Sequence, residues 1–290
     1  MIRTLAVAAF VALLGSASAR SEELHSGGKL LLTGGVTSVE GSGGGGLASW
    51  ATITGYGTRE GVGANVHATL VTLPDFQFRS VGGAVGLFDR LELSYARQSL
   101  DTSDAGAKLG LGRSFTFHQD VLGAKLRLVG DAVYDQDRWL PQLAVGAQYK
   151  NADKAAVIGQ LGGQHDKGVD IYISATKVFL AQNLVLNGTV RATKANQTGL
   201  LGFGGPGGHN DRRLQFEGSA GMLLTKRLLV GAEYRTKPNN LGLREDDWYD
   251  LFAAYALNKS LSVTAGYADL GTIATFKGQR GLYLSLQAGF

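Results

Sequence analysis

Few residues of this 290-residue chain have the types and spacing that catalysis or metal binding requires. Cysteine is absent, which removes thiol nucleophiles, disulfides and thiolate metal sites. The histidines are scattered, with no pair at metal-ligand spacing: His25, His67, His118, His165 and His209. His118 with Asp120, and His165 with Asp166, place a histidine near an aspartate, but sequence proximity alone does not make a catalytic pair. We therefore predict no catalytic residue, no metal and no cofactor, and interpret the protein as a non-enzyme.

Charged residues that recur at every second position are more informative. Lys125 and Arg127 alternate with leucines. Two such cations are hard to place in the core of a soluble protein, but they fit the water-filled interior of a barrel whose outer face is apolar. Five basic and five acidic residues are predicted to line such an interior: Lys125, Arg127, Arg191, Arg213, Arg235, Glu92, Asp170, Glu217, Glu233 and Asp250. Two interpretations remain open. The charges could pair across the lumen and hold a narrow barrel nearly shut, or form a constriction that selects small polar or zwitterionic solutes.

The last ten residues, 281–290, show most clearly the kind of element that would position these charges. Every second residue is apolar, from Leu282 to Phe290, and the residues between them are small or polar apart from Tyr283. This is the period of a strand with one apolar face. An amphipathic strand that ends in Phe resembles the closing strand of Gram-negative outer-membrane β-barrels. The resemblance implies an assembly signal, read by the barrel-assembly machinery, that comprises Tyr283, Leu284, Leu286, Ala288 and Phe290.

Similar alternation recurs along the chain in segments of about 9 to 11 residues, the length that a tilted transmembrane strand needs. The connections at 225–227 and 258–260 are short, whereas those at 194–212, 236–246 and 269–279 are long. We predict an all-β protein, a closed antiparallel up-and-down transmembrane β-barrel of about 14 strands, within a range of 12 to 16. Closure is expected because an open edge would leave backbone groups unpaired in lipid. The upper end of this range includes strands at 29–37, 47–56 and 109–117.

Composition agrees with this class. Beyond the N-terminus no apolar run reaches the length of about 18 residues that a transmembrane helix needs, although 44% of the residues are hydrophobic. Glycine is abundant, at 43 residues, and proline is scarce, at 4. The net charge of +4 is spread without a basic run, so we expect no nucleic-acid partner.

Three regions are predicted. Residues 1–19 have the charge, apolar run and small-residue cleavage site of a signal peptide. Residues 20–46 include a glycine run and form either a first strand or a plug. Residues 47–290 form the barrel.

Two stretches carry further resemblances. The hairpin at 81–95, with its Phe-Asp-Arg turn, is similar to transporter-like outer-membrane families linked to the uptake of aromatic or hydrophobic compounds. The mature chain, with Gly-Lys-Leu-Leu-Leu-Thr-Gly-Gly at 28–35, resembles a bacterial family known only as a domain of unknown function. Neither resemblance implies a catalytic residue.

These observations predict a protein of the Gram-negative outer membrane, most simply a passive channel or uptake protein for small solutes. A plugged barrel that serves envelope integrity or adhesion is the alternative, and a lipid-modifying enzyme with a rim histidine facing lipid is the third. The expected partners are outer-membrane lipid, lipopolysaccharide, the barrel-assembly machinery and an unidentified small solute. The sequence does not specify an oligomeric state.

Overall fold

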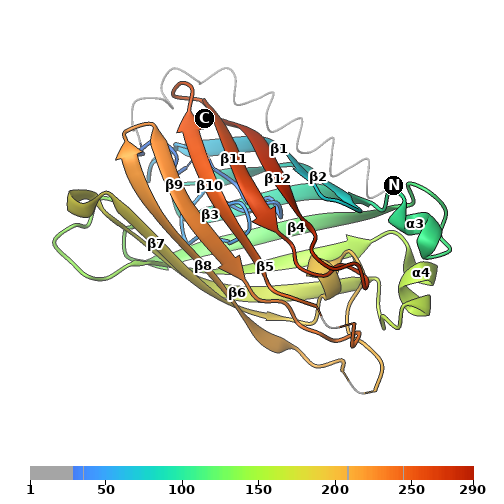
Figure 1. The fold of residues 1–290 in the computed structure, drawn as a ribbon. Coiled ribbons are helices and arrows are strands. Elements are labelled where there is room, and N and C mark those ends of the chain that lie inside the picture. The colour runs from blue at the N-terminus through green and yellow to red at the C-terminus, as the bar shows by residue number, and fades with distance from the viewer. Residues whose placement is uncertain (1–28, 35, 208, 244) are drawn as a thin grey trace.

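The computed structural model describes residues 29–34, 36–207, 209–243 and 245–290, and these form one closed β-barrel (Figure 1). Each strand pairs antiparallel with its neighbours in the chain, and β1 pairs with β12 to close the ring. The strands are β1 (Val62–Thr72), β2 (Gln77–Leu87), β3 (Leu91–Asp101), β4 (Thr116–Val129), β5 (Gln142–Ala152), β6 (Lys167–Phe179), β7 (Leu184–Thr193), β8 (Arg213–Thr225), β9 (Leu228–Arg235), β10 (Trp248–Ala256), β11 (Leu261–Asp269) and β12 (Arg280–Gly289). The predicted fold class is therefore confirmed, with the strand number at the lower end of the predicted range.

Side-chain alternation explains why these segments form the wall. In β12, Leu282, Leu284 and Leu286 are about half exposed on the outer face, whereas Tyr283 and Ser285 are buried on the inner face. The same alternation follows every strand, so one face is suited to acyl chains and the other to the lumen. All ladder hydrogen bonds lie within the ring, as lipid requires of a spanning structure.

Loop lengths sort by side. One end of the barrel carries the turns at 88–90, 180–183, 226–227 and 257–260, and only the connection at 130–141 is long there. The other end carries the long connections at 102–115, 153–166, 194–212, 236–247 and 270–279, and only residues 73–76 are short. We call these the short-turn end and the long-loop end. The long loops include α3 (Ala105–Lys108) and α4 (Ala155–Gln160), drawn together at one end in Figure 1.

The tight turn at 88–90 shows how local sequence sets the register. Phe88 and Asp89 both have positive φ, and the amide of Arg90 donates to the carbonyl of Leu87. The register pairs Leu87 with Leu91, so three residues make this hairpin turn, and the two positive φ values give it a twist that matches the flanking strands. Among the residues that the structure describes, no helix has the length and apolar character to cross a membrane.

The N-terminal residues fill the bore. Residues 29–34 and 36–61, here called the plug, enter at the short-turn end and return to the same end, where β1 begins. Residues 32–34 and 36–55 are buried, and isolated bridges join Thr37 to Gly43 and Gly44 to Ser49. In Figure 1 this stretch coils inside the barrel. The plug has no ladder of hydrogen bonds to any wall strand, so it is held mainly by side chains.

Several predicted strands are wrong, and this accounts for the count of twelve. The strand predicted at 47–56 and the described part of 29–37 belong to the plug, so the wall begins at Val62 and not at residue 47. Residues 109–115 lie in a loop. The alternation at 155–161 also predicts a strand, but Ala155–Gln160 form α4, since a short apolar run fits a buried helix as well as a strand. The predicted signal peptide at 1–19, and residues 20–28 of the N-terminal segment, lie outside the described residues.

Two apolar clusters cover the ends of the filled bore. At the long-loop end, wall residues such as Phe78 and Trp248 pack with loop residues such as Leu200 and Ile273 and with Leu47 of the plug. At the short-turn end, Trp50 and Val36 of the plug pack against inward-facing wall residues that include Val185 and Leu229. Between these clusters lies a layer of buried charge.

Candidate functional site in the filled lumen

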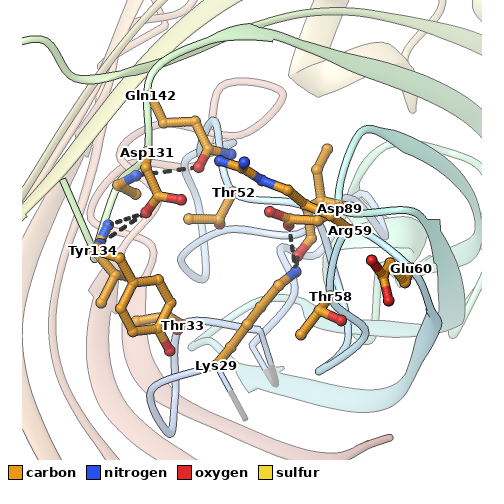
Figure 2. A pocket seen from close by; sticks show the side chains of 13 residues that line it. Lys29, Thr33, Thr52, Thr58, Arg59, Glu60, Asp89, Asp131, Tyr134 and Gln142 are labelled. Carbon is orange, nitrogen blue, oxygen red and sulfur yellow. Dashed lines mark hydrogen bonds and ion pairs between the residues drawn. The ribbon is translucent and has the colours of Figure 1, made fainter. Parts of the chain in front are cut away.

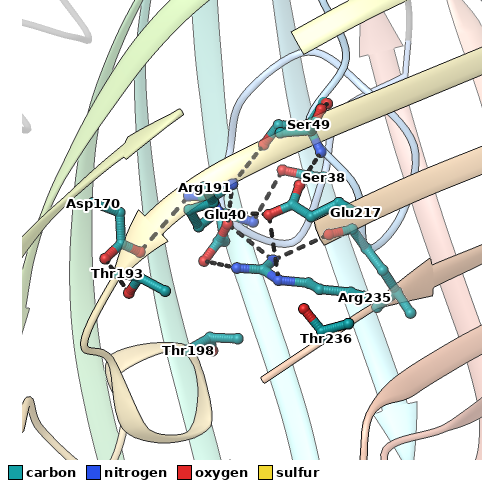
Figure 3. Close-up of polar contacts among 12 residues, drawn as sticks. Ser38, Glu40, Ser49, Asp170, Arg191, Thr193, Thr198, Glu217, Arg235 and Thr236 are labelled. Atoms are coloured by element: carbon teal, nitrogen blue, oxygen red, sulfur yellow. Dashed lines mark hydrogen bonds and ion pairs between the residues drawn. The ribbon is translucent and has the colours of Figure 1, made fainter. Parts of the chain in front are cut away.

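Glu40 of the plug lies at the centre of the charged layer (Figure 3). Its carboxylate oxygens lie 2.5 Å from Nζ of Lys150, 3.0 and 3.1 Å from the guanidinium of Arg235, and 3.4 Å from Nη2 of Arg191. The three cations come from β5, β9 and β7. Burial alone would raise the pKa of Glu40, but Arg235, Lys150 and Arg191 hold that pKa well below its usual value. One carboxylate therefore links the plug to three separate strands.

Two wall carboxylates complete the charge balance. Asp170 lies 2.7 Å from Lys150 and 3.7 Å from Arg191. Glu217 lies 2.5 Å from Nε of Arg191 and 3.5 Å from Nε of Arg235. Three cations thus face three anions with almost no exposure to solvent. Buried ions are tolerated only when they are matched and hydrogen-bonded in this way.

A second ion pair holds the plug nearer the short-turn end. Lys125 Nζ lies 3.1 Å from Glu92 Oε2 and donates to the carbonyl oxygens of Gly43 and Trp50 at 2.9 and 3.0 Å. Glu92 accepts from the amides of Gly43 and Thr54 at 3.0 and 2.8 Å. A Cβ at Gly43 would lie 2.8 Å from Oε2 of Glu92, so a side chain at this position would displace the Glu92 carboxylate from its contacts.

Of the ten residues predicted to line the lumen, the structure buries nine in the interior. Arg127 pairs with Asp89 and Asp131 at the short-turn mouth. The exception is Arg213, the first residue of β8, which is exposed and contacts His209 in the preceding loop. Alternation places a residue on a face but does not tell where a strand leaves the lumen.

Two residues central to the layer are absent from the ten charges predicted to line the lumen. Alternation along β5 does point Lys150 inward, together with Gln142 and Gln148. Glu40 has no such signal, since it lies in a glycine- and serine-rich segment without a period. Sequence reasoning could identify the wall charges but not the plug carboxylate that joins them.

A cavity of about 590 Å³ opens at the short-turn end beside the plug (Figure 2). Lys29, Arg59, Asp89 and Asp131 line it together with the ring of Tyr134. Lys29 lies 2.7 Å from Asp89. Burial would raise the pKa of Asp131, but the amides of Tyr134 and Val133, together with Arg127, lower that pKa. The mouth therefore carries fixed charges of both signs.

Among the histidines that the structure describes, none has both a serine and an acidic residue as hydrogen-bond or ion-pair partners. His67 Nε2 lies 3.2 Å from Ser80 Oγ inside the wall, where both are buried. His118 Nδ1 lies 3.3 Å from Asp153, and Ser99 is opposite His118 in the register. No hydrogen bond joins Ser99 to His118 in the described ranges. Within the same ranges no group of three or more metal-ligating side chains could hold a metal ion.

Comparison with curated proteins found no match. Among solved structures, the KdgM porin in complex with disordered oligogalacturonate is similar with a TM-score of 0.51 and 9% identity, over 78% of this chain and 99% of that one. Another KdgM porin structure gives a TM-score of 0.49 at 9% identity over the same shares. The outer membrane protein Omp33 of Acinetobacter baumannii gives 0.45 at 9% identity, over 78% of this chain and 97% of that one.

At such identities the likeness shows the fold alone, that of a porin-like outer-membrane β-barrel. The family described as "Protein of unknown function (DUF3034)" matches residues 33–287, which is most of the chain. The protein therefore belongs to the DUF3034 family.

Proposed function

We propose that this protein is an outer-membrane channel for the uptake of small polar or zwitterionic solutes, and that the plug closes it in the conformation described. The observation that carries the proposal is the charged inner wall, in which Glu92, Lys125, Lys150, Asp170, Arg191, Glu217 and Arg235 ring the middle of the bore. Side-chain rings of both signs are the means by which pores select charged solutes.

The energetics of the charged layer favour a lumen that can become wet. A buried ion pair seldom stabilises more than apolar residues of the same volume would, because both ions lose their hydration. A permanently filled bore would be served as well by apolar packing. The wall charges regain their hydration if the plug leaves and water enters. They therefore suit a channel that is closed only part of the time.

The contacts between plug and wall are of a replaceable kind. Ser49 illustrates this, because its amide donates to Glu217 and its carbonyl accepts from Thr189 and Asn187. Water can substitute for such partners when the plug moves, whereas a continuous strand ladder would have to unzip. Export by the N-terminal segment and a place in the outer membrane are part of the same proposal, which assigns no enzymatic step.

A cross-link between plug and wall provides the test. The amide nitrogen of Ala51 lies 2.8 Å from Oγ1 of Thr176, so plug and wall are adjacent there, and we choose these two positions for the cysteines of a disulfide. The chain has no native cysteine to interfere. In planar bilayers we expect the oxidised Ala51→Cys/Thr176→Cys protein to be silent, and the reduced protein to show openings like those of the wild type.

The matched control links two wall strands. Thr69 and Ser285 are opposite in the register of β1 and β12, with their hydroxyl oxygens 2.7 Å apart. A disulfide between Thr69→Cys and Ser285→Cys should leave conductance unchanged. A folded wild-type protein that never conducts, under any voltage or redox condition, would overturn the channel proposal.

A second candidate is a permanently plugged barrel that serves envelope integrity. The two apolar clusters at the ends of the bore favour it, since their burial resists removal of the plug. This candidate expects the reduced and oxidised proteins to be equally silent and the plug to remain inaccessible to reagents.

A further inference from the structure

Two buried carboxyl groups lie outside the balanced network. Glu233 on β9 and Asp250 on β10 are opposite in the register, and both side chains face the lumen with at most 2% exposure. Side chains directly opposite on paired strands have Cβ atoms about 4.5–5.5 Å apart. Two groups that can each carry a negative charge are therefore neighbours in a dry site.

Neither carboxyl group has a cationic partner among the described residues. The lumen's ion pairs use Glu40, Asp170, Glu217 and Glu92, and none of them reaches Glu233 or Asp250. Arg235 is the nearest cation along β9, and it is occupied by Glu40 and Glu217. With both groups ionised, the lumen would hold two uncompensated negative charges.

The two carboxyl groups differ in their hydrogen bonds. Glu233 accepts from the amide of Leu47 and from Ser219 Oγ, each at 2.6 Å. Asp250 Oδ1 is buried without a hydrogen-bond partner, and the hydroxyl of Tyr283 is buried near the same site. That hydroxyl and Glu233 Oε2 both lie close to Gly46, at 3.1 and 3.4 Å from the position a Cβ would take. The environment thus favours a charge on Glu233 and leaves Asp250 as the group that needs a proton.

The plug is fitted closely to this pair. A Cβ at Gly45 would lie 1.7 Å from Glu233 Oε1, and the amide of Leu47 binds the other oxygen. The glycine run of the plug thus packs around the Glu233 carboxylate. A change in the charge beside it would act directly on the plug.

We propose that Glu233 and Asp250 form a proton-binding site that holds a single proton on Asp250 at neutral pH and so helps to keep the plug seated. Two neighbouring carboxylates out of water do not both ionise. When the proton leaves for the aqueous phase, the second negative charge repels Glu233, and the repulsion is relieved if water enters around Gly45 and Leu47. Alkaline conditions therefore loosen the plug. The consequence for solute passage rests on the proposed function, whereas the proton site does not.

Other ionisable groups face this site or titrate in the same range. Glu217, Arg235 and Glu40 adjoin it through the charged network, and Tyr283 faces it from β12. In the loop at 236–247, burial lowers the pKa of Lys237 to about 8. Release of the plug at alkaline pH is therefore assigned to the carboxyl pair by comparing the wild type with Asp250→Asn and Glu233→Gln.

Infrared spectroscopy of the folded full-length protein tests the proton directly. We expect a protonated-carboxyl carbonyl band near neutral pH that disappears as the pH rises, and that is missing in Asp250→Asn. A spectrum in which Asp250→Asn leaves this band unchanged would overturn the proton site. The infrared measurement requires no conductance, so its result is independent of the channel proposal.

Cysteine labelling tests the effect on the plug. Ser42 is buried in the plug and Asn239 is exposed in a loop of the long-loop end, so Ser42→Cys reports plug opening and Asn239→Cys corrects for the reactivity of the thiol itself. Between about pH 6 and about pH 10 the ratio of the two labelling rates should rise several-fold. Asp250→Asn and Glu233→Gln should each remove that rise. If the ratio of labelling rates rises in both variants as it does in the wild type, the proposal that this proton site keeps the plug seated is overturned.

Discussion

Glu40 is the residue on which the charge balance of the lumen depends, because it is the plug's contribution to a cluster of three cations and three anions. We predict that Glu40→Gln, which keeps the shape of the side chain, destabilises the seated plug by about 3–5 kcal/mol, the usual cost of removing one partner from a buried ion network. The open fraction in planar bilayers and the labelling of Ser42→Cys should both rise. Unchanged values for both would mean that Lys150, Arg191 and Arg235 find other partners.

Acid should have a related effect. Because the pKa of Glu40 in the folded protein lies well below its ordinary value of 4.5, its charge stabilises the seated plug fully above that value. The contribution is lost as the pH falls through the lowered pKa. Labelling of Ser42→Cys should therefore increase below about pH 4 in the wild type. The Glu40→Gln protein should lack this component, and an identical acid response in both would contradict it.

The wall charges were largely predictable at this scale because a period of two assigns each residue to one face. Lys125, Arg191 and Asp250 were found in this way. The pairings were not predictable, since a partner on a strand far along the chain depends on register and barrel size. Nor was Glu40, whose segment has no period to read.

Among the elements, β2 shows how the wall makes room for the plug. Gly86 faces inward, and a methyl group there would meet the carbonyl oxygen of Thr54 at 2.3 Å and Ile53 at 2.8 Å. Gly86→Ala should therefore displace this part of the plug and destabilise the closed state by about 1–3 kcal/mol, as overpacking generally does. A raised open fraction in planar bilayers is the expected result.

Gly188 on β7 provides the control, because its Cβ position has nothing within 4 Å. Gly188→Ala changes the same residue type within a wall strand without touching the plug. If both variants behave alike, the effect belongs to strand formation and not to the space reserved for residues 53 and 54.

Element type was predicted best where alternation ran for nine or more residues, as in β8 and β12. It was wrong where the signal was short or ambiguous. Residues 47–56 alternate well enough for a strand, yet they find no partner strand and coil within the bore. The sequence of one segment does not show whether a neighbouring strand is free to pair with it. Whether residues 47–56 form a strand is therefore decided by the rest of the chain.

On the scale of the molecule, the plug and the wall should differ in stability. The wall is closed by a continuous ladder, whereas the plug is held by hydrogen bonds, ion pairs and two apolar clusters. We predict that the plug is released at lower denaturant concentrations than the wall, as a separate unit of local unfolding.

Trp50 is a suitable reporter, because it is buried in the plug and its indole nitrogen donates to Ser219 at 2.9 Å. With Trp139→Phe and Trp248→Phe, it becomes the only tryptophan. Its fluorescence should change before the far-ultraviolet circular dichroism of the strands. Coincident transitions would instead indicate one cooperative body and favour the permanently plugged barrel.

The path of the plug has a mechanical consequence. Both of its ends are attached at one mouth, Lys29 beside Asp89 and residue 61 leading into β1, so it forms a loop inserted from a single side. Such a loop can be withdrawn along the axis without threading an end through the cylinder. A pull applied from that side, on the chain before Lys29, would load the contacts of Lys29 first and those of Glu40 later. Tension on the N-terminal chain would thus release the plug in steps, and the plug would return to the bore when the tension ceases.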